Sequence, residues 1–170
     1  MRVNFCSVAL LLMAFGCAGP RGTTKEVEVR IQPNENRIEL EELVQSIFSK
    51  VNEHRAGKNL PRLILNEEIN LIARRHSASM AQGVIGFSHR GTHSRFRRIG
   101  QYVGGMHKAE NLARIWGHED PATKAIEEWI KSPSHRKAME DGRFRITGIG
   151  VAKSSDEKYY FTQLFVQPLR

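Results

Sequence analysis

The chain has 170 residues, 40% of them apolar and 26% charged, which suits one folded domain with a hydrophobic core and excludes a largely disordered protein. The formal net charge of +8 suggests an anionic partner, either lipid or wall polymer. The lysines and arginines are dispersed, and no basic motif is interleaved with aromatic residues, so we expect no nucleic-acid binding. The densest basic groups are Arg95, Arg97, Arg98 and Lys131, Arg136, Lys137.

The first seventeen residues predict export. Arg2 precedes an almost continuously apolar run, Phe5 to Phe15, which suits a signal peptide and is too short to cross a bilayer. Gly16 stands immediately before Cys17, as in bacterial lipoprotein signals, where the cysteine becomes the acylated first residue. We therefore expect a signal peptide at 1–17 and a membrane-anchored lipoprotein of the cell envelope. Free secretion and an uncleaved anchor are the alternatives.

Cysteine usage agrees with a fold that needs no disulfides. The only other cysteine, Cys6, lies in the same N-terminal segment, so the folded part has no cysteine ligand or cysteine nucleophile. Residues 18–37 are turn-rich and charged, which predicts a tether, although alternating apolar residues allow a short edge strand at 27–31. The folded domain is expected at 38–170.

Apolar residues at steps of three and four predict several helices. The first runs from Ile38 to about Gly57. The second follows the N-cap Asn66 and ends near Gln82. Another begins at Asp120-Pro121, where proline suits the first helical position, and a short helix spans about 133–139. The glycine- and arginine-rich stretch 83–105 is predicted to be a long, exposed, functional loop.

The C-terminal residues predict a sheet. Residues 145–153 and 159–167, separated by a polar turn, have the pattern of an antiparallel hairpin. Apolar residues occur on both faces of each strand, which indicates helices on both sides of the sheet. Helices followed by a C-terminal sheet predict a layered α+β domain.

Three titratable residues are the best candidates for a functional cluster. His89, Glu110 and His135 are 21 and 25 residues apart, too far to share one helix. Imidazole serves as base, acid or metal ligand, and a carboxylate can fix its tautomer. A structural hydrogen bond is the competing explanation for each residue, and spacing alone does not show that they meet. His76 lies on an apolar stripe and is expected to be a hydrogen-bonded core imidazole.

Short islands of sequence resemble a known family. In chain order they are Val51-Asn52-Glu53-His54-Arg55, Phe87-Ser88-His89, Ala109-Glu110-Asn111-Leu112-Ala113, Trp129, Ser132-Pro133-Ser134-His135-Arg136, Gly148-Ile149-Gly150-Val151-Ala152 and Tyr160-Phe161-Thr162-Gln163-Leu164-Phe165. Together they resemble the CAP superfamily, also called SCP or sperm-coating-protein-like domains, in its short, disulfide-free bacterial form. The resemblance covers roughly residues 40 to 167.

The resemblance implies an α–β–α sandwich with an antiparallel sheet between helical layers. In many members a cleft is lined by two histidines and two acidic residues. His89 matches the first histidine and Glu110 the first acid. Ser132 stands where the second acid would fall and Tyr160 where the second histidine would, so the four-residue site is incomplete here. His135, in the Ser-Pro-x-His-Arg motif, is expected to complete a three-residue cluster.

The resemblance implies an extracellular module that binds a lipid, a cell-wall fragment or a protein in this cleft. A second hypothesis is a hydrolase or peptidase in which His89 or His135 is the base and Glu110 orients it, with zinc held by the three residues in a metal-assisted version. A third is a structural envelope lipoprotein. The chain has no HExxH pair and no serine in a nucleophile-elbow context, which argues against familiar hydrolase classes.

Overall fold

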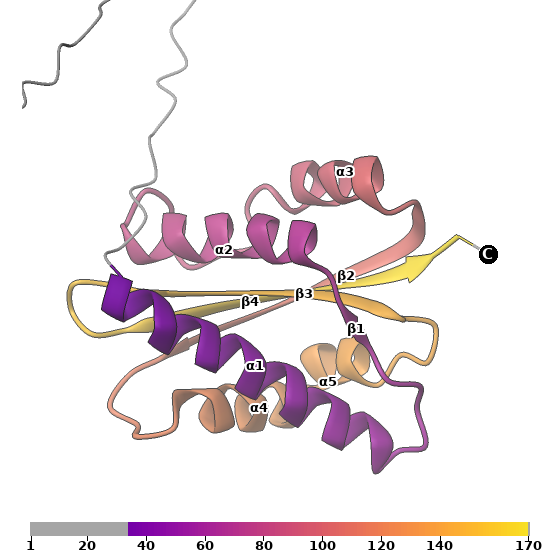
Figure 1. Ribbon diagram of the computed structural model, residues 1–170, viewed down its shortest axis with the longest axis horizontal. Helices are drawn as coiled ribbons and strands as arrows, with labels where there is room; N and C mark the ends of the chain where they lie inside the picture. Colours follow the sequence, from indigo (N-terminus) through magenta and orange to yellow (C-terminus); the bar gives the residue numbers. More distant parts are fainter. Residues whose placement is uncertain (1–33, 170) are drawn as a thin grey trace, which may run out of the picture.

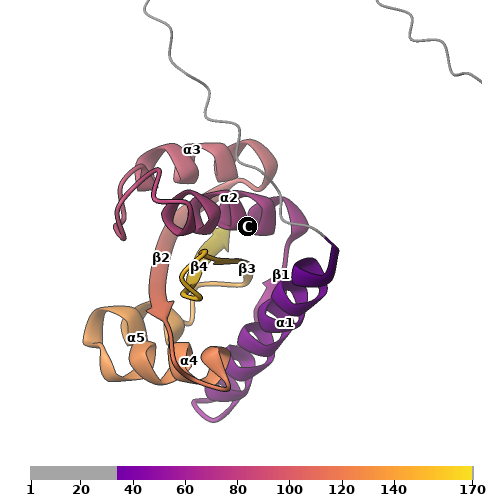
Figure 2. The ribbon, with the colours of Figure 1, turned by 90° about the vertical axis from the view of Figure 1, so that its left-hand side faces the viewer.

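The computed structural model describes residues 34–169 as a sheet between two layers of helices (Figure 1). The elements are α1 (Asn34–Ala56), β1 (Ile64–Leu65), α2 (Glu67–Ala81), α3 (Thr92–Tyr102), β2 (Gly105–Ile115), α4 (Pro121–Lys131), α5 (Pro133–Met139), β3 (Ile146–Lys153) and β4 (Tyr159–Pro168). Helices α2 and α3 cover one face of the sheet, and α1, α4 and α5 cover the other (Figure 2). The predicted α+β sandwich is confirmed.

Several predictions concern residues that the structure does not describe. The signal peptide, Cys6, Cys17, the optional strand at 27–31 and most of the tether lie outside 34–169. Within 34–169, no helix combines the length and the apolar character needed to cross a bilayer.

The sheet has the strand order β1-β3-β4-β2 and is mostly antiparallel. Strands β3 and β4 form the predicted hairpin, and β2 joins β4 antiparallel, with Glu110 opposite Leu164. Only the short β1 runs parallel to its neighbour, β3. Strand β2 was not predicted. It is one edge of the sheet, and its side chains point alternately toward the two helical layers.

Two predicted helix caps are confirmed. Asn66 Oδ1 accepts a hydrogen bond from Ile69 N at 3.0 Å at the start of α2, and Asp120 Oδ1 accepts one from Thr123 N at 2.9 Å at the start of α4. Both side chains satisfy backbone N–H groups that have no partner inside the helix. Helix α1 begins at Asn34, four residues before the predicted Ile38, because the apolar stripe from which its start was inferred begins after a polar first turn.

The prediction of a loop throughout 83–105 is wrong, because this stretch contains the whole of α3. The helix buries a stripe of only a few side chains, chiefly Phe96 and Ile99 with Val103 just beyond the end. Its other face is basic, polar and exposed. Gly91 and Gly104 flank the helix, so the composition of the stretch suggested a loop.

Two glycines in β3 allow α2 to pack closely against the sheet. A Cβ atom on Gly150 would stand 2.0 Å from Arg74 N, and one on Gly148 would stand 2.4 Å from the carbonyl carbon of Ile69. Any side chain at these positions would push α2 away from β3. The close approach also allows Ser77 Oγ to donate to Gly150 O at 2.9 Å.

Arg55, near the end of α1, is fully buried in the other layer. Its guanidinium donates to four backbone carbonyls, those of Pro61 at 2.9 Å, Met139 at 2.7 Å, Asp141 at 3.1 Å and Phe144 at 3.2 Å. One side chain thus joins α1 to the two segments that follow α1 and α5.

Candidate functional site at the edge of the sheet

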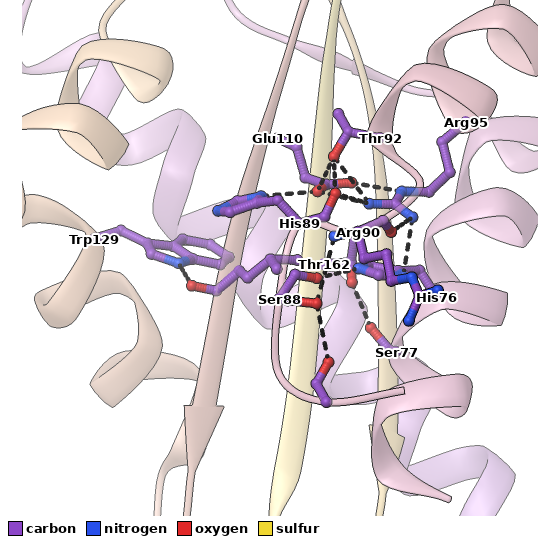
Figure 3. Close-up of polar contacts among 12 residues, drawn as sticks. His76, Ser77, Ser88, His89, Arg90, Thr92, Arg95, Glu110, Trp129 and Thr162 are labelled. Carbon is purple, nitrogen blue, oxygen red and sulfur yellow. Dashed lines mark hydrogen bonds and ion pairs between the residues drawn. The ribbon is translucent and has the colours of Figure 1, made fainter. Parts of the chain in front are cut away.

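Strand β2 connects the two helical layers. Successive side chains of a strand point to opposite faces, so Glu110 faces the α2–α3 layer and Asn111 faces the α4–α5 layer. Asn111 Nδ2 donates to His135 O at 3.0 Å, which holds the start of α5 against the strand. Trp129 Nε1 donates to Leu112 O at 2.9 Å and ties α4 to the same strand (Figure 3).

On the other face, Glu110 forms a buried ion pair with Arg95 of α3. Arg95 Nε donates to Oε2 at 2.6 Å and Nη2 donates to Oε1 at 2.8 Å, the two-point arrangement that suits a carboxylate and a guanidinium. Only 2% of the Glu110 side chain and 11% of the Arg95 side chain are exposed. The pair therefore forms a rigid, largely water-free support beneath the surface.

His89 binds to this support from the outside. Its Nδ1 lies 2.8 Å from Glu110 Oε1, and 55% of its side chain is exposed (Figure 3). Because an ionised carboxylate only accepts hydrogen bonds, Nδ1 carries the proton in the neutral ring and Nε2 keeps its lone pair. No residue of the described chain donates a hydrogen bond to Nε2.

The turn before α3 fixes the backbone of His89. Thr92 N donates to His89 O at 3.1 Å, and Thr92 Oγ1 lies within hydrogen-bond distance of both His89 O and Glu110 Oε1. Arg95 Nη1 also donates to Arg90 O at 2.9 Å. The turn and the start of α3 therefore fix the main chain of His89, and the Glu110 carboxylate fixes its ring.

His76 of α2 completes the support from the inside. It is buried; its Nδ1 accepts from Arg95 Nη1 at 3.0 Å and its Nε2 donates to Ser88 O at 3.1 Å. Burial, followed by the positive charge of Arg95, lowers the pKa of His76 to about 4, so the ring is neutral at neutral pH. The predicted hydrogen-bonded core imidazole is confirmed.

The carboxylate is ionised despite its burial. Desolvation on its own would raise the pKa of Glu110, but the hydrogen bonds and charge of Arg95, together with the hydrogen bond from His89, outweigh it, and the pKa is lowered. Glu110 is thus a negative charge between a permanent cation and an imidazole.

His135 approaches from the opposite layer. The ring centres of His89 and His135 lie 6.5 Å apart, and His135 is half-buried. Burial, and then the charge of His89, lowers its pKa, which favours the neutral ring. The structure thus brings the three predicted residues to one edge, with a direct bond between His89 and Glu110 and a second imidazole beside them. We call His89, Glu110 and His135 the edge site.

Ser132 and Tyr160 lie outside the edge site. Ser132 is between α4 and α5, and its Oγ lies 3.2 Å from Ser134 Oγ. Tyr160 is buried in β4 and packs with its ring centre 6.3 Å from that of Phe87. Tyr160 therefore supports the segment that leads to His89. In the part of the chain that the structure describes, neither residue hydrogen-bonds to the edge site.

The family follows from comparison with known proteins. The family model described as CAP, the cysteine-rich secretory protein family, matches residues 48–165. The chain belongs to the CAP family. Although the family is named for its cysteines, residues 34–169 of this CAP domain contain none. No curated protein matches the chain significantly.

Solved structures from bacteria share the fold. An outer surface protein from Borrelia burgdorferi is 22% identical, with a TM-score of 0.64, over 75% of this chain and 94% of its own. An extracellular protein containing an SCP domain, from Bacillus anthracis, is 26% identical, with a TM-score of 0.65, over 81% of this chain and 44% of its own. A cysteine-rich secretory protein from Staphylococcus aureus is 20% identical, with a TM-score of 0.60, over 75% of this chain and 39% of its own.

The edge site of this CAP domain does not fit a three-ligand zinc ion. Both oxygens of Glu110 face the Arg95 guanidinium, which places a positive charge where a metal would need the carboxylate. Within residues 34–169, no group of three or more histidine, cysteine, aspartate or glutamate side chains is placed to hold one ion. The hypothesis of a zinc site at His89, Glu110 and His135 is therefore not supported by the geometry.

Sequence reasoning missed the residues beneath the edge site. Arg95 was noted only as one of several basic residues, and Thr92 was placed in a loop. The usable signal was the inward stripe of α3, in which Thr92, Arg95, Phe96 and Ile99 follow at helical spacing. A polar residue on such a stripe requires a buried partner, and Glu110 is that partner.

Proposed function

We propose that this chain is an exported, lipid-anchored CAP-domain protein that binds an extracellular ligand at the edge site. The observation that supports this most directly is the orientation of His89. Its ring is held by a buried ion pair and leaves Nε2 as a free acceptor on an exposed side chain. A ring fixed in advance loses little conformational freedom on binding, so such a site favours recognition.

The chemistry of the edge site favours a polar ligand. His89 Nε2 accepts a hydrogen bond, and the neutral His135 ring adds a second polar contact 6.5 Å away, measured between the ring centres. Hydroxyl and amide groups are suitable donors for imidazole acceptors. Of the three ligand classes considered, a cell-wall fragment with sugar hydroxyls and peptide N–H groups meets this requirement better than a lipid chain, and a protein segment meets it through its amides.

The proposed location rests on the N-terminal sequence and on relatives. The apolar run before Cys17 has the pattern of a lipoprotein signal. The Bacillus anthracis relative is titled an extracellular protein, and the Borrelia burgdorferi one an outer surface protein. Lipidation predicts that the wild-type protein partitions into detergent and that Cys17→Ser does not; a wild-type protein found wholly in the aqueous phase would refute it.

The hydrogen bond between His89 and Glu110 favours a second hypothesis, that the protein is a hydrolase. A carboxylate that fixes an imidazole tautomer also prepares it as a general base. In the described residues no serine or threonine hydroxyl bonds to His89 Nε2, so water would be the nucleophile. Release of new amino or reducing ends from wall fragments by the wild-type protein, absent in His89→Gln, would support this alternative.

Ligand binding can be tested with soluble wall glycopeptide fragments as the probe. We expect the ring signals of His89 and His135 to shift in NMR spectra on titration, and His89→Gln or His135→Gln to weaken binding at least about tenfold, the effect of about 1.4 kcal/mol. His118→Gln is the matched control, because His118 lies in the exposed loop between β2 and α4. Equal binding by all three variants, or no shift at either ring, would contradict the proposal.

A further inference from the structure

Positive charge is concentrated in one helical layer. Between Glu68 and Glu110 the chain has seven lysine and arginine residues and no carboxylate, against a formal net charge of +8 for the whole chain. This segment forms most of α2 and all of α3, which lie over one face of the sheet, and the start of β2, an edge strand of that sheet (Figure 2). When Glu67, Glu68 and Glu110 are included, residues 67–110 have a formal net charge of +4, half of that of the whole chain.

Within that layer, the outer face of α3 presents unpaired arginines. Arg97 and Arg98 are exposed on α3, with Arg97 on the side opposite the buried Ile99, and Arg90 is exposed in the preceding turn. In the part of the chain that the structure describes, no carboxylate forms an ion pair with any of the three. In the opposite layer, by contrast, Lys124 pairs with Glu127 and Glu128.

Exposed apolar side chains follow these arginines along the chain. Tyr102 follows Arg98 by four residues, so the two occupy the same side of α3, and 51% of Tyr102 is exposed. Met106, at the start of β2, is 70% exposed. Leu169 is 62% exposed, and its N–H donates to Gly104 O at 3.1 Å, which places the end of β4 beside the same connection.

We propose that this surface, formed by Arg90, Arg97, Arg98, Tyr102 and Met106 and here called the α3 surface, docks the domain on an anionic lipid bilayer. Guanidinium groups bind lipid phosphates through two hydrogen bonds, and aromatic and apolar side chains beside them enter the headgroup region. A soluble anionic polymer would pair with the arginines but leave Tyr102 and Met106 in water. The combination of charge and apolar area therefore favours a bilayer.

Docking goes beyond the proposed ligand binding and would strengthen the anchor. Helix α1 begins 17 residues after Cys17, and a chain of that length reaches at most about 60 Å. An acylated Cys17 would keep the α3 surface near the membrane, where even weak docking is favoured by effective concentration. Arg90 directly follows His89, so a docked domain holds the edge site close to the bilayer. Only the effective concentration that acylated Cys17 provides relies on the lipid anchor.

The test uses the full chain with Cys17→Ser, so that acylation does not contribute. We expect it to co-sediment with phosphatidylcholine vesicles that contain phosphatidylglycerol, more weakly as salt rises, and not with phosphatidylcholine alone. Arg97→Gln/Arg98→Gln should weaken binding about thirtyfold. Lys131→Gln/Lys137→Gln removes the same charge from exposed positions in the other layer and should leave binding nearly unchanged.

Equal weakening by the two double variants would overturn the proposal, because binding would then follow net charge alone. A second variant, Tyr102→Ser/Met106→Ser, separates a bilayer from a soluble polymer. We expect it to weaken vesicle binding several-fold and to leave binding to soluble polyphosphate unchanged. The proposal would also be wrong if the protein did not co-sediment with phosphatidylglycerol vesicles, or if it bound them equally well without Tyr102 and Met106. Neither result affects the wall-fragment test of the edge site, which contains no lipid.

Discussion

Two arginines, one in each helical layer, join distant parts of this domain and differ in what they bind. Arg55 is fully buried and donates only to backbone carbonyls, from Pro61 to Phe144. Arg95 binds titratable side chains, Glu110 and His76, and the chain of contacts continues to an exposed imidazole. The first arrangement holds the backbone, whereas the second fixes a side chain that a ligand can reach.

The comparison shows that the burial of a charged side chain does not by itself indicate a functional role. Arg55 is the more buried of the two, yet its hydrogen-bond partners are backbone carbonyls, which do not change charge. Arg95 is part of a group whose charges depend on one another, and such groups are more often functional. The two networks should therefore respond differently to substitution and to pH, and four experiments can break or sharpen the contrast.

Arg95→Met should have the largest effect, a loss of roughly 5 kcal/mol of unfolding free energy at neutral pH, because the buried carboxylate of Glu110 loses its permanent cation and keeps only its contacts with His89 and Thr92. The loss should shrink in acid. The folded-state pKa of Glu110 is below its ordinary value of 4.5 in the wild type, so its stabilising effect is complete above that value and disappears as the pH falls through the folded pKa. Urea unfolding at several pH values measures this, and a pH-independent loss would contradict it.

Arg55→Met should cost about 4 kcal/mol, since four backbone carbonyls lose their donor and two of these hydrogen bonds, to Met139 and Phe144, are buried. Its partners do not titrate, so the loss measured by urea unfolding should remain the same between neutral and mildly acidic pH. The edge site should be unaffected: the NMR signals of the His89 ring should match those of the wild type. A loss that changes with pH as in Arg95→Met would remove the contrast between the two arginines.

His76→Gln tests the inner side of the Arg95 network. The amide can still accept from Arg95 and donate to Ser88, so the neutral-pH cost should be about 1 kcal/mol. The pKa of His76 is about 4 in the folded state and near 6.5 in the unfolded state. As the pH falls from 6.5 to 4, the unfolded state therefore binds a proton that the folded state does not, and the unfolding free energy of the wild type decreases. Glutamine does not titrate, and the advantage of the wild type should therefore fall by about 3 kcal/mol over this window.

Local signals explain which parts of the fold could be predicted. The caps at Asn66 and Asp120 and the hairpin of β3 and β4 depend on residues that are neighbours in sequence, and all were found. Helix α3 and strand β2 depend on tertiary contacts. The buried stripe of α3 has few apolar residues, and β2 places the polar Glu110 and Asn111 inside. Neither shows a clean hydrophobic period.

The same reasoning applies to the candidate site. Residue type and family resemblance pointed to His89 and Glu110, and the structure places them in direct contact. The spacing within α3 indicates that Arg95 points inward, but it does not identify the partner, because the carboxylate comes from a different element 15 residues away. Resemblance also pointed to Ser132 and Tyr160, but Ser132 contacts Ser134 and Tyr160 packs against Phe87.

His89→Gln should have the smallest effect on stability and the largest on recognition. More than half of the side chain is exposed, and Arg95 still binds both oxygens of Glu110, so the unfolding free energy should change by less than about 0.5 kcal/mol. Binding of wall glycopeptide fragments should nevertheless weaken at least about tenfold, because glutamine does not place an acceptor at the position of Nε2. Calorimetry and urea unfolding on the same samples separate the two effects. If stability falls as far as in Arg55→Met while binding is unchanged, the Arg95 network, like that of Arg55, only holds the fold.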